Sequence, residues 1–135
     1  MSRPPRILET CLYCDDLDAA EAFYGGVVGL ERIARVEGRH VFFRADGGML
    51  LIFDPAQTAR PAASADAPPP HGAHGPGHVC FSAAPDGIEA WERRLARAGA
   101  AIEARISWPG GARSIYARDP AGNSVEFAEP ALWPL

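Results

Sequence analysis

The stretch Arg118-Asp119-Pro120-Ala121-Gly122-Asn123-Ser124-Val125-Glu126 contains a tight-turn signal next to the start of an apolar run. Pro fixes φ, whereas Gly and Asn tolerate positive φ, so Asp-Pro-Ala-Gly-Asn favours a turn. The flanking runs, Arg113–Ala117 and Ser124–Ala128, are typical of short strands, and the whole predicts a β-hairpin. Glu126 then lies in the middle of a strand, on the face opposite to its two apolar neighbours. Because burying an unpaired carboxylate is costly, the hairpin predicts a partner for Glu126.

Composition limits the classes of protein to which the chain can belong. Its 135 residues, 47% of them apolar, suit one compact domain or two small halves that share a core. A net charge of -4 without a Lys/Arg cluster disfavours nucleic-acid binding, and no apolar run approaches the roughly 20 residues of a membrane span. The three cysteines, Cys11, Cys14 and Cys80, are an odd number at no disulfide-framework spacing, which favours a reduced cytoplasmic protein.

The first half of the chain predicts a strand, a helix and three further strands. Asp15-Asp16 can cap a helix that begins near Leu17 and ends at Gly29, with Ala20, Phe23, Tyr24 and Val27 at helical spacing. The predicted strands are Ile7–Cys14, Arg32–Glu37, His40–Ala45 and Met49–Asp54.

The second half repeats this order after a segment of different composition. Residues Pro55 to Gly77 are rich in Pro and Ala and have no periodicity, which indicates a linker or an ordered lid. A helix near Asp86–Ala98 places Ile88, Trp91 and Leu95 on one face. The predicted strands are His78–Ala83, Ala101–Ile106, Arg113–Arg118 and Ser124–Ala128. The predicted parts are therefore a first module at 1–55, a linker or lid at 56–77 and a second module at 78–135.

The two halves match residue by residue as well as in order. A shift of 69 residues relates Glu9 to His78 and Cys11 to Cys80, and a shift of 75 relates Leu51 to Glu126. An internal βαβββ duplication describes this best. Such a module exposes a sheet face that it cannot cover alone, so two modules pair within one chain or between two chains. The predicted fold class is α+β, with paired βαβββ modules and the helices on the outside.

Period-two alternation identifies a polar face on each half. These faces carry Glu9, Cys11 and Tyr13 on the first strand, His78, Cys80 and Ser82 on the matching strand, and Ser124, Glu126 and Ala128 on the last strand. A sheet curled around a cavity would show this pattern, and a small ligand would bind in that cavity.

Glu9, His78 and Glu126 are a candidate set of metal ligands. One imidazole and two carboxylates suit one divalent ion, which could be Zn, Mn, Ni, Co or Fe(II), and three protein ligands leave positions open for water or substrate. Taken singly, each residue also fits a structural role, as an edge or salt-bridged glutamate or as a hydrogen-bonded core histidine. His71 and His74 could join His78 at a metal or form a lid, although incidental histidines in a linker also explain them.

Further residues are candidates for the wall of the substrate pocket: Cys11, Tyr13, Leu51, Cys80, Trp108, Tyr116 and Arg118. Tyr116 shares its alternation with Ser114, and Trp108 precedes Pro-Gly-Gly, where it could sit at the cavity mouth. Arg118 either holds the hairpin or reaches an anionic substrate. Cys11 and Cys14 are three apart on a strand and point to opposite faces, which argues against a redox or zinc pair.

Taken together, these motifs resemble the vicinal oxygen chelate superfamily. They are Glu9 to Leu17, Ala22-Phe23-Tyr24, Gly29-Leu30, Gly77-His78-Val79, and Asp119 to Asn123 with Glu126. The superfamily includes glyoxalase I, bleomycin-resistance proteins, fosfomycin-resistance enzymes and extradiol dioxygenases. The resemblance implies a U-shaped mixed sheet around a cavity and, commonly, a homodimer. It places Glu9, His78 and Glu126 at metal-ligand positions, and Leu51 where glyoxalase I has a fourth, carboxylate ligand. The three-ligand arrangement is similar to that of the fosfomycin enzymes and dioxygenases, which usually have His at the position of Glu9.

The function that follows is a metal-dependent enzyme of the lyase, isomerase or transferase kind. Its metal would chelate two neighbouring oxygens of a small substrate and stabilise an enolate or oxyanion, while Glu126 or Glu9 moves a proton. One alternative is a metal-free binding protein of the bleomycin-resistance kind. Another is an Fe(II) extradiol dioxygenase.

Overall fold

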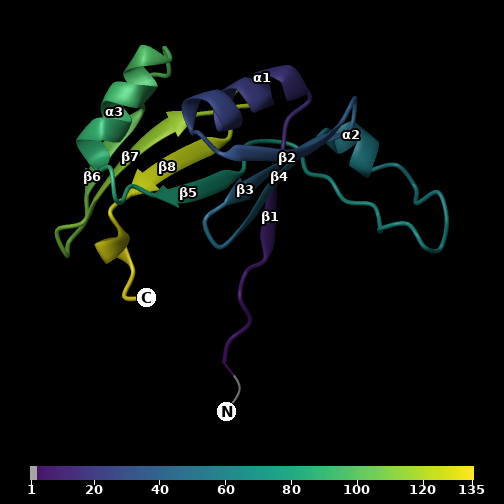
Figure 1. Ribbon diagram of the computed structural model, residues 1–135, viewed down its shortest axis with the longest axis horizontal. Coiled ribbons are helices and arrows are strands. Elements are labelled where there is room, and N and C mark those ends of the chain that lie inside the picture. Colours follow the sequence, from purple (N-terminus) through teal and green to yellow (C-terminus); the bar gives the residue numbers. More distant parts are fainter. Residues whose placement is uncertain (1–2) are drawn as a thin grey trace. The chain divides into compact units, whose positions relative to one another are not determined.

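The computed structural model describes residues 3–135, so the first two residues of the predicted first module lie outside it. The chain divides into unit 1 (Met1–His74) and unit 2 (Gly75–Leu135), drawn from purple to yellow in Figure 1. The division falls inside the segment that the sequence predicts as a linker or lid. Among the described residues, no helix is long and apolar enough to cross a membrane.

Unit 1 has one mixed sheet in the order β1-β4-β3-β2, in which β1 is parallel to β4 and the other pairs are antiparallel. A helix follows β1, as the sequence predicts, and a short helix follows β4. The elements are β1 (Glu9–Tyr13), α1 (Leu17–Glu21), η1 (Ala22–Val27), β2 (Glu31–Val36), β3 (His40–Ala45), β4 (Gly48–Phe53) and α2 (Pro55–Thr58).

Unit 2 repeats this topology with the order β5-β8-β7-β6, β5 being parallel to β8. Its elements are β5 (His78–Ser82), α3 (Ile88–Arg97), β6 (Ala104–Ser107), β7 (Arg113–Arg118), β8 (Ser124–Ala128) and η2 (Pro130–Leu132). Cys11 lies opposite Leu51 in unit 1, and Cys80 lies opposite Glu126 in unit 2. The strand registers therefore confirm the duplication and both of its residue shifts.

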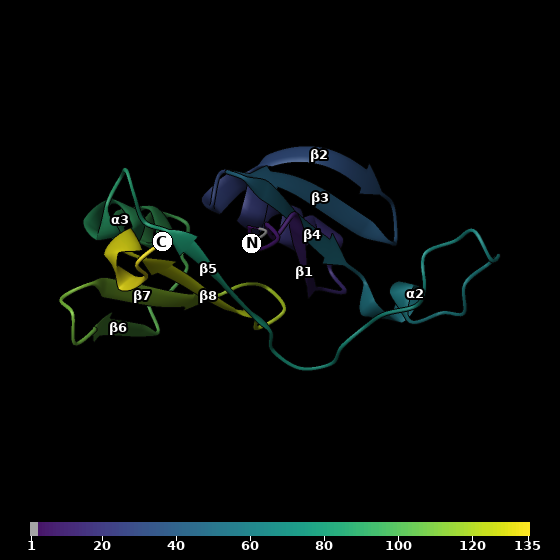
Figure 2. The same ribbon diagram turned by 90° about the horizontal axis from the view of Figure 1, so that it is seen from below.

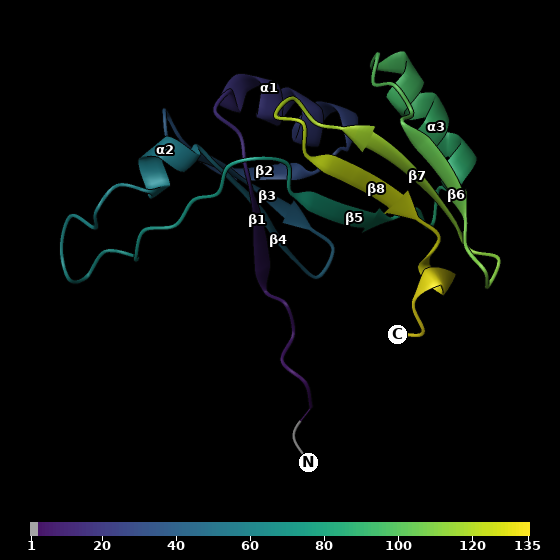
Figure 3. The same ribbon diagram turned by 180° about the vertical axis from the view of Figure 1, so that it is seen from behind.

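Each sheet has one face covered by its own helix. In unit 1, α1 contacts β3 and β4, and in unit 2, α3 contacts β7 and β8, as Figure 3 shows from behind. The helix that begins with α1 continues as a π-helical turn, in which the Val28 N–H bonds to the Phe23 carbonyl. Because a π turn holds an extra residue, Val28 is buried where the α-helical spacing indicated Val27. In unit 2, Trp91 stacks on Phe127 with ring centroids 4.3 Å apart.

The hairpin that joins β7 to β8 confirms the predicted turn. Asp119 Oδ1 accepts hydrogen bonds from the backbone N–H groups of Ala121 and Asn123, and Gly122 has a φ of 84°, which favours glycine. The Asn123 Oδ1 accepts the Gly77 N–H at 2.7 Å, so the turn also fixes the residue before β5. This bond aligns His78 with β8.

The Pro- and Ala-rich segment is not a plain linker. After α2 the chain leaves and returns, as Figure 2 shows, and the backbone N–H of His71 closes this loop on the Thr58 carbonyl at 3.0 Å. A Cβ at Gly72 would lie 3.1 Å from the Pro55 carbonyl oxygen, so the returning chain passes close to the start of α2. Residues 59–70 thus form a closed loop on unit 1, typical of Ω-loops.

Candidate functional site

The polar face of unit 2 brings five side chains together on the side of the sheet away from α3. They alternate along β5, β7 and β8 as the sequence predicts, and they are His78, Cys80, Ser114, Tyr116 and Glu126. Glu126 is only 6% exposed, although it is a carboxylate on a strand. Its partners are therefore the main question about this site.

His78 meets Glu126 at the open side of this face. The Nε2 of His78 lies 3.2 Å from the Oε1 of Glu126, and the Nδ1 lies 3.0 Å from the Ser124 carbonyl oxygen. A carbonyl only accepts, so Nδ1 carries a proton and donates it. Nε2 then faces a carboxylate oxygen, and both of these atoms can accept a proton or bind a metal ion. A cation between these two acceptors, either a proton or a metal ion, would satisfy both.

The other oxygen of Glu126 is fixed by a buried relay. The Ser114 hydroxyl, 1% exposed, donates to Oε2 of Glu126 at 2.6 Å and accepts the Nε1–H of Trp108 at 2.8 Å. An indole N–H can only donate, so the single hydroxyl proton of Ser114 goes to the carboxylate. The relay therefore fixes the plane of the carboxylate, with Oε1 on the side of His78.

Two neighbouring side chains are held in their protonated forms. Burial, followed by the nearby Glu126 carboxylate, raises the pKa of the Cys80 thiol to about 12. The same two causes raise the pKa of Tyr116 above its ordinary value, and the Tyr116 ring stacks beside His78 at 6.4 Å. Neither group is a thiolate or phenolate near neutral pH, so both have a proton to donate here.

The His78–Glu126 pair fits part of a metal site. Two donor atoms at about 2.1 Å from one ion lie about 3.0 Å apart at a right angle and about 3.4 Å apart at a tetrahedral angle, so a separation of 3.2 Å suits adjacent ligands. The Nδ1–H bond to a carbonyl is also the usual outer contact of a metal-binding histidine. Among residues 3–135, however, no group of three or more His, Cys, Asp or Glu residues is close enough to hold an ion. Glu9 belongs to unit 1, and its role as third ligand stays a prediction.

Unit 1 presents a more apolar face at the equivalent positions. Leu51 is 9% exposed and lies opposite Cys11, while Glu9 is exposed at the start of β1. The Tyr13 hydroxyl bonds to Nδ1 of His71 at 2.7 Å, and the His71 ring packs edge-on against Phe53. His71 is thus an anchor of the loop on this face rather than a free linker histidine.

The remaining predicted pocket residues have defined partners. Trp108 reaches Glu126 through Ser114, whereas Arg118 pairs with the Glu103 carboxylate and donates to the Gly122 carbonyl. Arg118 therefore stabilises the hairpin, and its contact with a substrate stays a prediction. Cys14 is buried on the helix side, apart from the half-buried Cys11. Sequence reasoning missed Ser114 as a functional residue, although its alternation with Tyr116 was the signal that could have found it.

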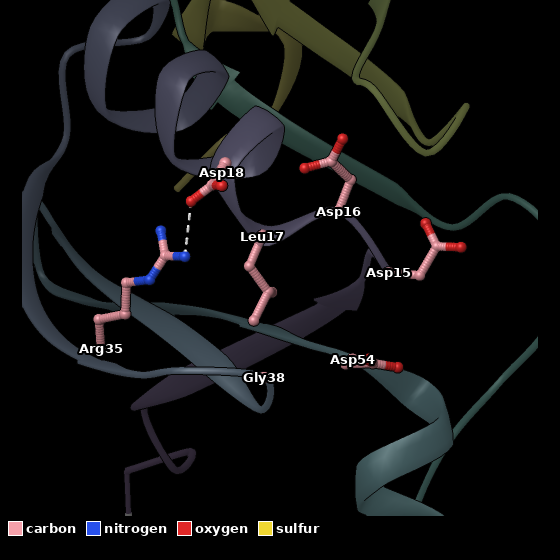
Figure 4. A pocket seen from close by; sticks show the side chains of 7 residues that line it. All are labelled: Asp15, Asp16, Leu17, Asp18, Arg35, Gly38 and Asp54. Atoms are coloured by element: carbon pink, nitrogen blue, oxygen red, sulfur yellow. Dashed lines mark hydrogen bonds and ion pairs between the residues drawn. The ribbon is translucent and has the colours of Figure 1, made fainter.

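A separate acidic pocket of about 520 Å³ lies in unit 1, between the starts of α1 and α2 (Figure 4). Three of its four carboxylates already have structural roles. Asp16 accepts the Ala19 N–H, Asp54 accepts the Ala56 N–H, and Asp18 pairs with Arg35 at 2.7 Å. This pocket is therefore explained by helix capping and an ion pair.

The fold is that of a known class. The chain belongs to the Glyoxalase/Bleomycin resistance protein/Dioxygenase superfamily, which matches residues 6–127. The family resemblance and the paired βαβββ architecture predicted from the sequence are both confirmed.

Solved structures give more specific similarities. A lactoylglutathione lyase from Agrobacterium tumefaciens is 47% identical, with a TM-score of 0.90 over 98% of this chain and 99% of that chain. A glyoxalase/bleomycin resistance protein/dioxygenase from Nocardioides is 25% identical, with a TM-score of 0.70 over 96% of this chain and 85% of that one. A glyoxalase family protein from Bacillus anthracis, 21% identical with a TM-score of 0.69 over 96% and 98%, shares the fold. No curated protein matches the chain.

Proposed function

We propose that the protein is a divalent-metal-dependent enzyme of the glyoxalase type that acts on a small substrate with two adjacent oxygens. The observation that carries this proposal is the 3.2 Å distance between His78 Nε2 and Glu126 Oε1, two atoms that can both bind a cation. A structural ion pair would not need the buried Ser114–Trp108 relay that orients the carboxylate. A metal site does need such support, because outer contacts orient its ligands.

His78 and Glu126 would hold the ion, with Glu9 as the third ligand from this chain or from a second copy. A bound divalent ion would act as a Lewis acid on the substrate oxygens and stabilise the negative charge that develops there. The chain itself supplies the proton chemistry. Glu126 or Glu9 accepts a proton from the substrate carbon and returns it. The Cys80 and Tyr116 side chains remain protonated and donate hydrogen bonds at the site.

The 47% identical lactoylglutathione lyase makes lactoylglutathione the first compound to test. Leu51 stands where the resemblance expects a fourth, carboxylate ligand, so we propose a site with three protein ligands instead of four. The proposal includes a homodimer, to be measured by light scattering after gel filtration, and a reducing cytoplasmic location, to be tested by cell fractionation. Three free cysteines support that location.

The experiment starts with metal analysis of protein purified without chelator. Thermal shift with Zn, Mn, Ni, Co and Fe(II) follows, and then formation of the thioester from methylglyoxal and glutathione is measured. We expect about one ion per chain and a stabilisation that His78→Ala and Glu126→Gln both remove. Asp86→Asn, which changes an exposed carboxylate of the same unit, is the matched control. A wild-type protein that no divalent ion stabilises, and that holds none, would refute the metal site.

A metal-free drug-binding protein is the second candidate, because the equivalent face of unit 1 is apolar. Leu51 and Phe53 are buried there beside the half-buried Phe42, whose ring lies edge-on to Phe53 at 5.3 Å. Binding of an aromatic ligand that survives in Glu126→Gln and with chelator present would favour this function. Oxygen uptake with catechol and Fe(II) would instead favour the dioxygenase.

A further inference from the structure

A second cavity, outside the candidate metal site, lies between the closed loop and the body of unit 1. It has a volume of about 590 Å³, within the usual range for small-molecule sites, and is lined by Arg39, Gln57, Arg60, Pro61, Pro68 and Pro69 among others. We propose that this pocket binds a small organic anion, a carboxylate or phosphate ester with an apolar body. The inference does not depend on the proposed metal chemistry.

The charge of the pocket is the first argument. No carboxylate lines it, although the whole chain has a net charge of -4. Among the described residues, six arginines form ion pairs with carboxylates, whereas Arg39 and Arg60 form none. The pocket therefore gathers two guanidinium groups whose charge the protein leaves unpaired. A planar guanidinium binds carboxylate and phosphate through two parallel hydrogen bonds, so an anion is the matching ligand.

Arg39 is held in place by two uncharged side chains rather than by a carboxylate. Its Nη1 donates to Nδ1 of the buried His40 at 2.7 Å, and its guanidinium lies over the Phe53 ring, 5.5 Å from the centroid. Burial, followed by the charge of Arg39, lowers the pKa of His40, so the imidazole is neutral and accepts this bond. These contacts limit the side-chain entropy that Arg39 would lose on binding a ligand.

Arg60 comes from the start of the loop and has fewer side-chain contacts than Arg39. Its guanidinium donates one hydrogen bond among the described residues, from Nη1 to the Gln57 Oε1 at 3.3 Å, which leaves its other donors available. The loop contributes a wall of proline and alanine side chains, which suit an apolar body better than a hydrated inorganic ion. The bond from the His71 N–H to the Thr58 carbonyl holds this wall in place.

The test uses phenyl phosphate and benzoate as probes, with inorganic phosphate for comparison, in calorimetric titrations of the full chain at constant ionic strength. We expect phenyl phosphate to bind at least tenfold more tightly than inorganic phosphate. Arg60→Gln, which removes no contact of the core, is expected to weaken phenyl phosphate at least tenfold, and Arg39→Gln at least as much. Arg97→Gln removes the same charge from an exposed position in unit 2 and should have no effect.

Each outcome decides the proposal. Binding that persists in Glu126→Gln and with chelator supports a site separate from any metal. Binding that Glu126→Gln abolishes would place the anion at the metal site and overturn the inference. Equal weakening by Arg97→Gln and Arg60→Gln would show a general charge effect and overturn it too, as would the absence of binding.

Discussion

Replacing Ser114 by alanine tests whether the buried relay prepares Glu126 for a metal ion. The substitution removes one hydroxyl that donates to the carboxylate at 2.6 Å and leaves the Trp108 Nε1–H without its acceptor. Glu126 keeps its place on β8. The carboxylate, however, loses the short hydrogen bond that fixes Oε2, so its orientation toward His78 is less restricted.

The size of the effect follows from the bond that is lost. A hydrogen bond to a charged group contributes about 1.5–3 kcal/mol, and each 1.4 kcal/mol is about a tenfold change in affinity. Loss of an outer contact of a metal ligand typically costs about 10–100-fold in affinity, which is the same range. We therefore expect the dissociation constant for Zn or Mn to rise by about 10–100-fold in Ser114→Ala.

Competition with a chromophoric chelator measures this constant, and thermal unfolding of the apo protein measures the stability separately. Ser107→Ala, on the exposed β6 of the same unit, is the matched control and should bind metal like the wild type. Trp108→Phe keeps the Ser114–Glu126 bond and should have a smaller effect. A Ser114→Ala protein that binds metal within twofold of the wild type, while Glu126→Gln does not bind, would refute the relay.

Three further predictions concern stability. Because the folded pKa of His40 lies below its ordinary value of 6.5, through burial and the charge of Arg39, the unfolded chain binds more protons below that pH. The free energy of unfolding should therefore fall from pH 7 to pH 5, and urea titrations should show a weaker fall in His40→Gln; an unchanged slope contradicts this. Arg113, by its hydrogen bonds and charge, lowers the pKa of Glu129. The stability that this ion pair adds to the folded protein is therefore present above the ordinary pKa of 4.5 and is lost as pH falls through the lower folded value. Arg113→Leu should accordingly cost stability at pH 7 but little at pH 2, as followed by circular dichroism, and an equal cost at both would argue against the ion pair. Asn123→Ala removes a buried side chain that bonds to Gly77 and Asp119, and should lower the free energy of unfolding by about 1–3 kcal/mol in denaturant titrations; a change below about 0.5 kcal/mol would show that the turn does not need it.

Local chemistry explains why the fold was predictable from the sequence. The turn at Asp119 to Asn123 needs particular residue types, and strand alternation assigns each neighbour to a face, so β7 and β8 have the predicted bounds. The duplication could be seen in the sequence because corresponding strands pair in the same register in both units, so matching residues keep a constant spacing. The pairing of His78 with Glu126 followed from these two facts.

The rest depends on side-chain packing that periodicity does not describe. Ser114 was visible only as an alternating residue, because its hydrogen bonds depend on how the Pro-Gly-Gly turn that follows Trp108 brings the indole next to β7. The π turn after α1 moved the buried position from Val27 to Val28, a shift that α-helical spacing cannot show. His71 anchors a loop by a hydrogen bond to Tyr13, and local sequence patterns do not show this contact because the two residues are 58 apart in the chain. The curling of both sheets around one cavity, and the place of Glu9 in it, stay predictions.

The matching registers of the two units offer a short route for protein engineering. Leu51 stands opposite Cys11 as Glu126 stands opposite Cys80, so one codon change, Leu51→Glu, would copy the acidic position into the first repeat. The new carboxylate would replace a side chain that is only 9% exposed. It would destabilise the metal-free protein until a bound cation neutralised its charge. A variant whose melting temperature is low without metal and returns to the wild-type value with added metal would be a scaffold that a metal ion switches.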